Sequence, residues 1–186
     1  AERILQEAIK KVEHLTDFKI RTAQFMIALI GVQVALNDTT ALDAAIAKVE
    51  QEGLRSLLSA DERAVFDTYA ADRAFQQAES AQERGEDLRA QEFLRRASSQ
   101  YKEVLNAEPN NHYIWFRLGQ VSLKLKDYAS AVSNFTTARQ FALKARDQDA
   151  GHWSLFFWIQ ALALSGDRSQ ARDLSVQYRQ KSFEIL

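Results

Sequence analysis

Cysteine is absent from the 186-residue sequence, proline occurs once and glycine six times. Without cysteine the chain has no disulfides, no thiolate nucleophile and no thiolate metal ligands. With so little proline and glycine it offers few hairpin turns, whereas the helix formers Ala, Leu, Glu, Gln, Lys and Arg dominate. We therefore predict an all-α protein.

A surplus of charge of either sign is also missing, because 24 Lys and Arg stand against 25 Asp and Glu. Binding to nucleic acid or to an anionic membrane surface depends on a surplus of Lys and Arg. The densest basic stretch, residues 84–102, is interspersed with acidic residues and is typical of a solvated helix face. We expect no nucleic acid among the partners.

Long hydrophobic runs are lacking as well. The longest, residues 25–36, is shorter than the about 20 residues of a membrane-spanning helix, so we expect a core helix and no membrane insertion. The start, AERILQEAIKK, is amphipathic and charged, unlike a signal peptide, and the only Met is Met26. These features fit a soluble piece of a larger or processed protein. We favour the cytoplasm over the periplasm, although a helical protein without cysteine suits both.

Catalytic and metal-binding motifs are not found. The three histidines, His14, His112 and His152, show neither H-x-x-x-H nor H-E-x-x-H spacing. The acidic residues lie on predicted polar faces, where no dry pocket would shift a pKa. We predict that the protein is not an enzyme and binds neither a cofactor nor a metal.

The helical pattern changes character near residue 58. Residues 1–58 predict a helix that ends at a break at Thr16-Asp17, a nearly all-round apolar helix over 18–36, and a third helix ending near Gly53. Ser59 and Glu62 then have the form of a capping box, which begins a long helix. We predict one continuous domain. Residues 1–58 supply N-terminal helices, for which an additional or divergent repeat stays open, and residues 59–186 form three helix pairs.

The three pairs are related by a repeat of 40–41 residues. Their turns are at Gly85-Glu86-Asp87, Lys126-Asp127 and Gly166-Asp167, and Asp149-Ala150-Gly151 is expected to separate the last two pairs. Four columns coincide at these offsets: the turn residues Gly85, Lys126 and Gly166; the alanines Ala90, Ala131 and Ala171; the phenylalanines Phe75, Phe116 and Phe156; and the polar residues Glu79, Gln120 and Gln160. One helix pair cannot cover its own apolar face, so neighbouring pairs are expected to stack.

The central pair, WFRLGQVSLKLKDYASAVSNFTTA, resembles the tetratricopeptide repeat (TPR) family. Six signature positions match: Trp115, Leu118, Gly119, Ala131, Phe135 and Ala138. Fewer agree in the flanking pairs, and the spacing exceeds the family's usual value of about 34 residues because the second helices are longer. The resemblance covers residues 71–183. It implies a TPR-like right-handed superhelix of antiparallel helix pairs.

In the resembled family, the first helices of successive pairs line a concave groove that holds a peptide or a helix of a partner. The positions implied here are Phe75, Glu79, Tyr113, Phe116, Gln120, Lys124, Trp153, Phe156 and Gln160. Aromatic side chains would supply contact area, and Gln amides would hold an extended backbone. The Lys and Asn with which some members clamp a terminal carboxylate are missing, so acidic chaperone tails are not expected as ligands.

Two functions stay open. The resemblance implies a protein–protein interaction scaffold with an aromatic-lined groove. In the alternative, the aromatics are buried and the chain is a structural, self-associating or regulatory module of a larger protein, with its groove filled internally. The last pair favours this alternative slightly, because HWSLFFWIQALAL is apolar on nearly all sides and a second copy could cover it, giving a homo-oligomer through the C-terminal repeat.

Overall fold

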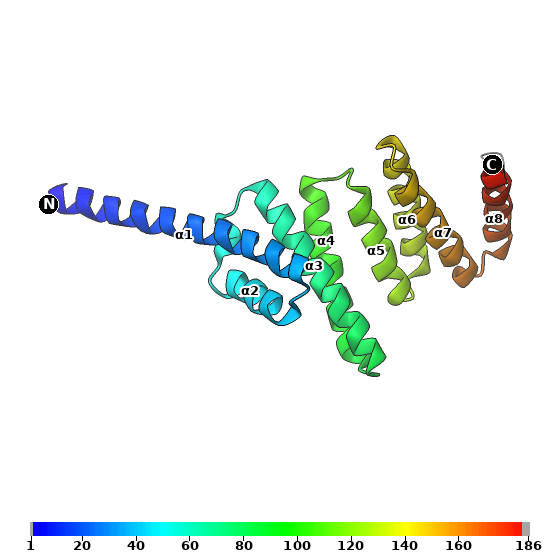
Figure 1. The fold of residues 1–186 in the computed structure, drawn as a ribbon, viewed down its shortest axis with the longest axis horizontal. Coiled ribbons are helices and arrows are strands. Elements are labelled where there is room, and N and C mark those ends of the chain that lie inside the picture. Colours follow the sequence, from blue (N-terminus) through cyan, green and yellow to red (C-terminus); the bar gives the residue numbers. More distant parts are fainter. Residues whose placement is uncertain (1, 184–186) are drawn as a thin grey trace. The chain divides into compact units, whose positions relative to one another are not determined.

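The computed structural model describes the backbone of residues 2–183 and the side chains of residues 14–179. The prediction of an all-α protein is confirmed, since the described residues form helices and no strand. The elements are α1 (Glu2–Leu36), α2 (Thr39–Gln51), the 3₁₀ helix η1 (Leu54–Leu57), α3 (Ala60–Glu83), α4 (Asp87–Ala107), α5 (His112–Lys124), α6 (Tyr128–Lys144), α7 (Gln148–Ser165) and α8 (Arg168–Phe183) (Figure 1).

The chain divides into two compact units, residues 1–73 and residues 74–186. The division falls inside α3, whereas the sequence patterns predict the boundary between the N-terminal helices and the helix pairs near residue 58. The predicted capping box at the start of α3 is present. The Ser59 backbone N–H donates to Glu62 Oε2 at 2.9 Å, and the Glu62 N–H donates to Ser59 Oγ at 3.3 Å.

Two predicted helix boundaries are wrong. Helix α1 runs without interruption through Thr16-Asp17, since neither residue blocks a helix when its side chain faces solvent. Helix α7 begins at Gln148, so the expected turn at 149–151 lies in its first turn. The start is fixed by Asp147, whose carboxylate accepts a hydrogen bond from the Ala150 N–H at 3.0 Å.

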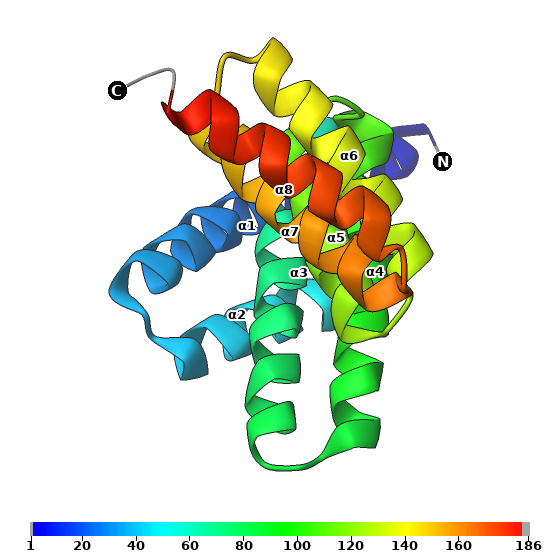
Figure 2. The ribbon, with the colours of Figure 1, turned by 90° about the vertical axis from the view of Figure 1, so that its right-hand side faces the viewer.

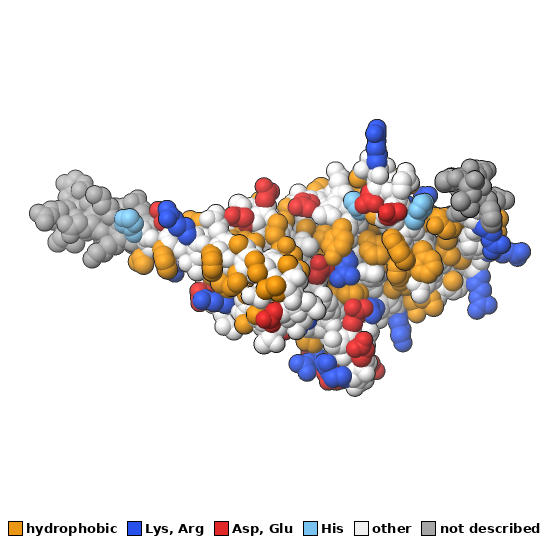
Figure 3. All heavy atoms as spheres, in the orientation of Figure 1, with side chains coloured by type: hydrophobic (Ala, Val, Ile, Leu, Met, Phe, Trp, Pro, Cys, Tyr) orange, Lys and Arg blue, Asp and Glu red, His pale blue; other side chains and the backbone are white. Residues whose placement is uncertain are grey.

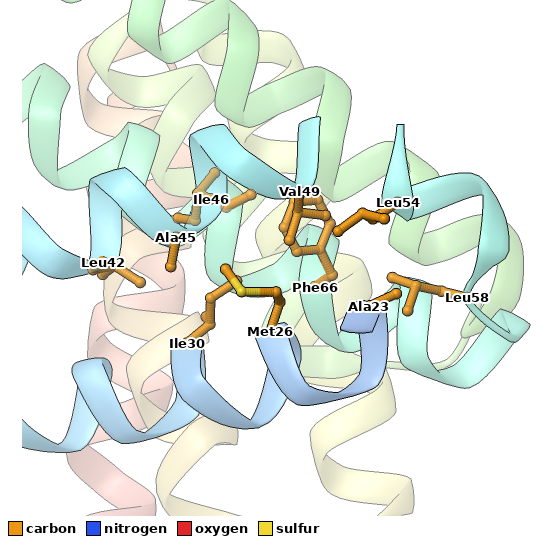
Figure 4. Close-up of a cluster of buried hydrophobic side chains, with 11 residues drawn as sticks. Ala23, Met26, Ile30, Leu42, Ala45, Ile46, Val49, Leu54, Leu58 and Phe66 are labelled. Carbon is orange, nitrogen blue, oxygen red and sulfur yellow. The ribbon is translucent and has the colours of Figure 1, made fainter. Parts of the chain in front are cut away.

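In the first unit, α1 packs against α2 and α3 through one face. Figure 4 shows Ala23, Met26 and Ile30 of α1 pointing toward α2 and toward Phe66 of α3. The buried cluster comprises Ala23, Met26, Ile30, Leu42, Ala45, Ile46, Val49, Leu54, Leu58, Phe66 and Ala70. Residues at spacings of three and four meet here because they share one face of each helix.

The expectation that the apolar run 25–36 is buried all round is also wrong. Of its members, only Met26 and Ile30 are buried, whereas Phe25, Val32 and Leu36 are exposed. The segment His14–Leu36 is 23 residues long, with a mean hydropathy of 1.3, and meets the length and composition of a membrane span. Core helices of soluble proteins and signal sequences meet the same criterion.

In the second unit, the three turn residues of the repeat share one backbone conformation. Gly85, Lys126 and Gly166 have φ values of 74°, 62° and 94°, in the left-handed region that ends helices. The alanine column is buried throughout, at Ala90, Ala131 and Ala171. Figure 2 shows the short turn between α3 and α4, and α4, α5, α6 and α7 each pack against the next helix along the chain.

Gly119 of α5 packs directly against Phe135 of α6. A Cβ atom built on Gly119 would lie 2.5 Å from Cε1 and 2.6 Å from Cδ1 of Phe135, a fully buried ring. Such distances are far shorter than any van der Waals contact, so only glycine fits here. Gly31 in α1 differs, because its Cβ would meet the Tyr69 hydroxyl at an ordinary 3.7 Å.

We predict opposite effects for alanine at these two mid-helix glycines. Gly119→Ala should lower the free energy of unfolding by about 1–3 kcal/mol, because the Phe135 ring has nowhere to move. Gly31→Ala should raise it by up to about 1 kcal/mol through helix propensity. Urea denaturation of both variants tests this, and a neutral or stabilising Gly119→Ala would contradict the packing described.

Candidate functional site

A surface pocket of about 680 Å³ lies between α5 and the start of α7. Its lining consists of His112, Tyr113, Phe116, Gln120, Asp147, Asp149, Ala150, Trp153 and Phe157. On the face shown in Figure 3, hydrophobic side chains gather over this part of the molecule, with acidic side chains beside them. The lining therefore combines aromatic surface with an acidic edge.

The helix starts that form one end of the pocket are held by side-chain caps. Asn111 caps α5 by accepting from the Ile114 N–H at 3.3 Å, and Asp147 caps α7. The second oxygen of Asp147, Oδ2, lies 3.2 Å from Nε2 of His112. This contact ties the first residue of α5 to the cap of α7, so it fixes the width of the pocket at this end.

The electrostatics of this end follow from the same contacts. The hydrogen bond from the Ala150 N–H lowers the pKa of the Asp147 carboxyl below its usual range, and His112 lowers it further. Asp147 is thus ionised near neutral pH, and exposed Asp149 in the first turn of α7 adds a second carboxylate. Both charges are favourable at a helix N-terminus.

The floor of the pocket is a packed group of aromatic rings. Phe116 meets Phe135 edge to face at a centroid distance of 5.6 Å and meets Phe157 at 5.3 Å. Phe135 and Phe157 stack at 5.5 Å. Because Phe135 is fully buried, these contacts hold Phe116 and Phe157 in fixed positions beneath the pocket.

The rim carries two aromatic side chains that remain accessible. Tyr113 on α5 is 42% exposed and Trp153 on α7 is 61% exposed. Gln120 accepts a hydrogen bond from Nη1 of Arg117 at 3.0 Å through its Oε1 atom. Its Nε2 group is thereby oriented as a donor, as recognition of a carbonyl oxygen requires.

Four of the nine residues expected at the groove line this pocket: Tyr113, Phe116, Gln120 and Trp153. Phe75 does not, and its expected place at the surface is wrong. Its ring is only 3% exposed, and the Arg117 guanidinium covers it at 4.4 Å from the centroid. Glu79 and Lys124 form an ion pair at 3.2 Å outside the pocket lining, and Lys124 also donates to Gln82 at 3.1 Å.

Phe156 and Gln160 are exposed on α7 but do not line the pocket. The next residue, Phe157, takes the position against Phe116 and Phe135. The repeat column aligned Phe156 with Phe116 by sequence offset. The ring that packs beside Phe116 is displaced from that column by one residue.

Five lining residues were not expected from the sequence: His112, Asp147, Asp149, Ala150 and Phe157. The acidic pair was missed because α7 was expected to begin after Gly151. The signal that could have located it is Asp147 itself, a strong N-cap residue three positions before Ala150. No such signal identifies Phe157. It is one of three consecutive aromatic residues, Phe156, Phe157 and Trp158, and the sequence does not show which of them faces the pocket.

Comparisons with known proteins do not assign this site. A scan against protein-family models finds no match to the chain, and a search of curated proteins finds none either. Over the described part of the chain, no three His, Asp or Glu side chains are placed to hold a metal ion. Chemically, the pocket offers aromatic contact area, a hydrogen-bond donor and negative charge, a combination suited to binding a side chain.

The Asp147 cap leads to a prediction for acid stability. Its pKa is lower in the folded state than in the unfolded chain, so it stabilises the fold above its usual pKa of about 4. That contribution is lost as the pH falls through the lowered folded value. Asp147→Asn keeps a cap but cannot titrate, so its unfolding free energy should fall less than the wild type's between about pH 5 and pH 2.

Urea denaturation at several pH values measures this difference. Asp127→Asn is the matched comparison, because Asp127 caps α6 and its pKa is lowered by hydrogen bonds from Ser130 without a histidine. It should show the same direction of change. An Asp147→Asn variant that loses stability in acid as steeply as the wild type would contradict the role of the carboxylate.

Proposed function

We propose that the second unit is a TPR-like protein-interaction module that binds a peptide or helix of a partner protein in the pocket between α5 and α7. The observation that carries this proposal is the pairing of a fixed aromatic floor with an accessible aromatic rim. Phe116 and Phe157 are held by their packing on Phe135, whereas Tyr113 and Trp153 remain open to a ligand.

The energetics of protein recognition support a site of this kind. Binding energy at protein interfaces concentrates in aromatic side chains at well-packed pockets. A floor that is already rigid in the free protein loses little conformational entropy when a ligand arrives. An apolar side chain of the partner would lie on Phe116, and the Gln120 amide would donate to a backbone carbonyl of the partner.

The charges of the lining define the partner's chemistry more closely. Asp149 has no ion pair or hydrogen bond among the contacts of the described residues, and Asp147 adds negative charge beside it. A Lys or Arg of the partner would be attracted to these carboxylates and to the exposed face of Trp153. The ligand is therefore a segment with a large apolar residue next to a basic one.

The packing of the second unit supports the TPR-like description. Gly119 against Phe135, the buried alanine column and the left-handed turns at Gly85, Lys126 and Gly166 agree with the signature positions that suggested it. Successive pairs would then continue into a right-handed superhelix, with α5 and α7 as neighbouring first helices. The pocket would be part of its concave face.

A second candidate, self-association through α7, is favoured by one specific observation. Helix α8 packs against α7, yet Phe156 and Leu164 remain 58% and 52% exposed. An apolar face that the chain's last helix leaves uncovered is typical of a protein interface. Phe156 lies outside the pocket, so substitutions can separate the two candidates.

The test begins with selection of peptides from a displayed random library on the wild-type protein. Peptides that pair an apolar residue with Lys or Arg should be enriched. Trp153→Ala should weaken binding of a selected peptide by about 30-fold or more, as for an interface hot spot. Phe156→Ala removes a similarly exposed aromatic one turn away, which contacts Trp153 and Phe157 but does not line the pocket, and should reduce the affinity much less.

Titration calorimetry of Trp153→Ala, Phe156→Ala and Asp149→Asn, each at low and at high salt, distinguishes the outcomes. Asp149→Asn should reduce the affinity several-fold at low salt and less at high salt. Equal binding by wild type and Trp153→Ala would exclude the pocket. A loss confined to Phe156→Ala, together with a concentration-dependent mass in light scattering, would instead support self-association through α7.

A further inference from the structure

Helix α1 presents two different apolar faces. One face, with Ala23, Met26 and Ile30, is buried in the core of the first unit (Figure 4). The other carries side chains that nothing in the described structure covers, with exposures of 51–69%: Leu15, Phe18, Phe25, Val32 and Leu36. Figure 3 shows hydrophobic side chains along α1 on the surface.

The exposed residues follow a heptad spacing. Together with the partly buried Thr22 and Leu29 they form the series 15, 18, 22, 25, 29, 32, 36, which alternates steps of three and four along the helix. We name these seven residues the α1 seam. Apolar residues at such steps over three heptads form the narrow stripe by which two helices pack in a coiled coil.

We propose that the α1 seam pairs with the α1 seam of a second copy of this chain, so that the protein is a homodimer through its first unit. The proposal goes beyond the peptide-binding function, which concerns the second unit. The five exposed residues of the seam are available to a second copy, whereas the adjacent face of α1, with Met26 and Ile30, packs in the core and Leu29 contacts that core.

The area of the seam approaches that of a stable interface. Taking about 150–250 Å² for a whole aromatic side chain and somewhat less for Leu and Val, the five exposed residues present on the order of 500 Å² per copy. Two copies bury on the order of 1,000 Å², close to the ~1,200 Å² at which stable specific interfaces begin. Thr22 and the aliphatic stems of Lys19 and Arg21 beside the seam add to this area.

The dimensions of the helix favour a second copy over a lipid bilayer. The segment His14–Leu36 has the length of a membrane span, but its uncharged part between Arg21 and Asp38 is about 24 Å long at ~1.5 Å per residue, shorter than the ~30 Å of a hydrocarbon core. A membrane-spanning α1 would also have to leave the core that Met26 and Ile30 form with α2.

The test is the mass of the full chain by light scattering, with Val32→Glu and Phe25→Glu as separate variants. A buried glutamate in the seam should raise the dimer dissociation constant by at least about 100-fold. Val65→Glu is the matched control, since Val65 is an exposed valine on α3 of the same unit, away from the seam. We expect dimers for the wild type and Val65→Glu, and monomers for both seam variants at equal helicity by circular dichroism.

Three results would overturn the proposal. The first is a wild-type chain that stays monomeric up to about 100 μM, a concentration at which weak specific interfaces associate. The second is a dimer that survives both seam substitutions. The third is a monomer that sediments with phosphatidylcholine–phosphatidylserine vesicles and loses this on Val32→Glu, which would make a bilayer the occupant. None of these results depends on peptide binding at the pocket.

Discussion

The packing of the second unit depends on one close contact between α5 and α6. At this contact α5 contributes Gly119, which has no side chain. The Phe135 ring occupies the space that a Cβ on Gly119 would need. The same ring contacts Phe116 and stacks on Phe157, so it sets the position of α7 as well as that of α5. The pocket floor is therefore the outer surface of a core contact. This explains how a shallow site can be rigid in a protein built from short helix pairs.

The parts of the fold that could be predicted from the sequence are those decided by neighbouring residues. The capping box of Ser59 and Glu62 and the all-helical character depend on local hydrogen bonds and on helix propensity. The incorrect boundaries arose where two local signals compete. Gly151 suggested a turn, but the cap supplied by Asp147 begins α7 earlier and places Gly151 inside the helix, where it is buried. Propensity alone does not decide between such signals.

The site was less predictable, because equal positions in a repeat do not have equal neighbours. Phe75, Phe116 and Phe156 share a sequence column, yet they are buried, partly buried and exposed in turn. Phe75 is covered by Arg117 from a later helix, whereas α8 packs against α7 and leaves Phe156 exposed. The acidic edge of the pocket comes from Asp147 in the connection between α6 and α7 and from Asp149 in the first turn of α7, both outside the repeat columns. Exposure depends on tertiary packing, which a sequence register does not contain.

Helix α1 shows the same limit, because the number of apolar residues in a helix does not determine which of them are buried. Its apolar residues are numerous enough to suggest burial on all sides, but the structure divides them between the core and the α1 seam. A dimer through the seam would carry two copies of the pocket, one in each second unit. A partner with two suitable segments, or a partner that is itself a dimer, would then bind its second segment at a raised effective concentration. Weak recognition at each pocket would become tight binding only for such bivalent partners, so the seam would determine which partners the pocket can retain.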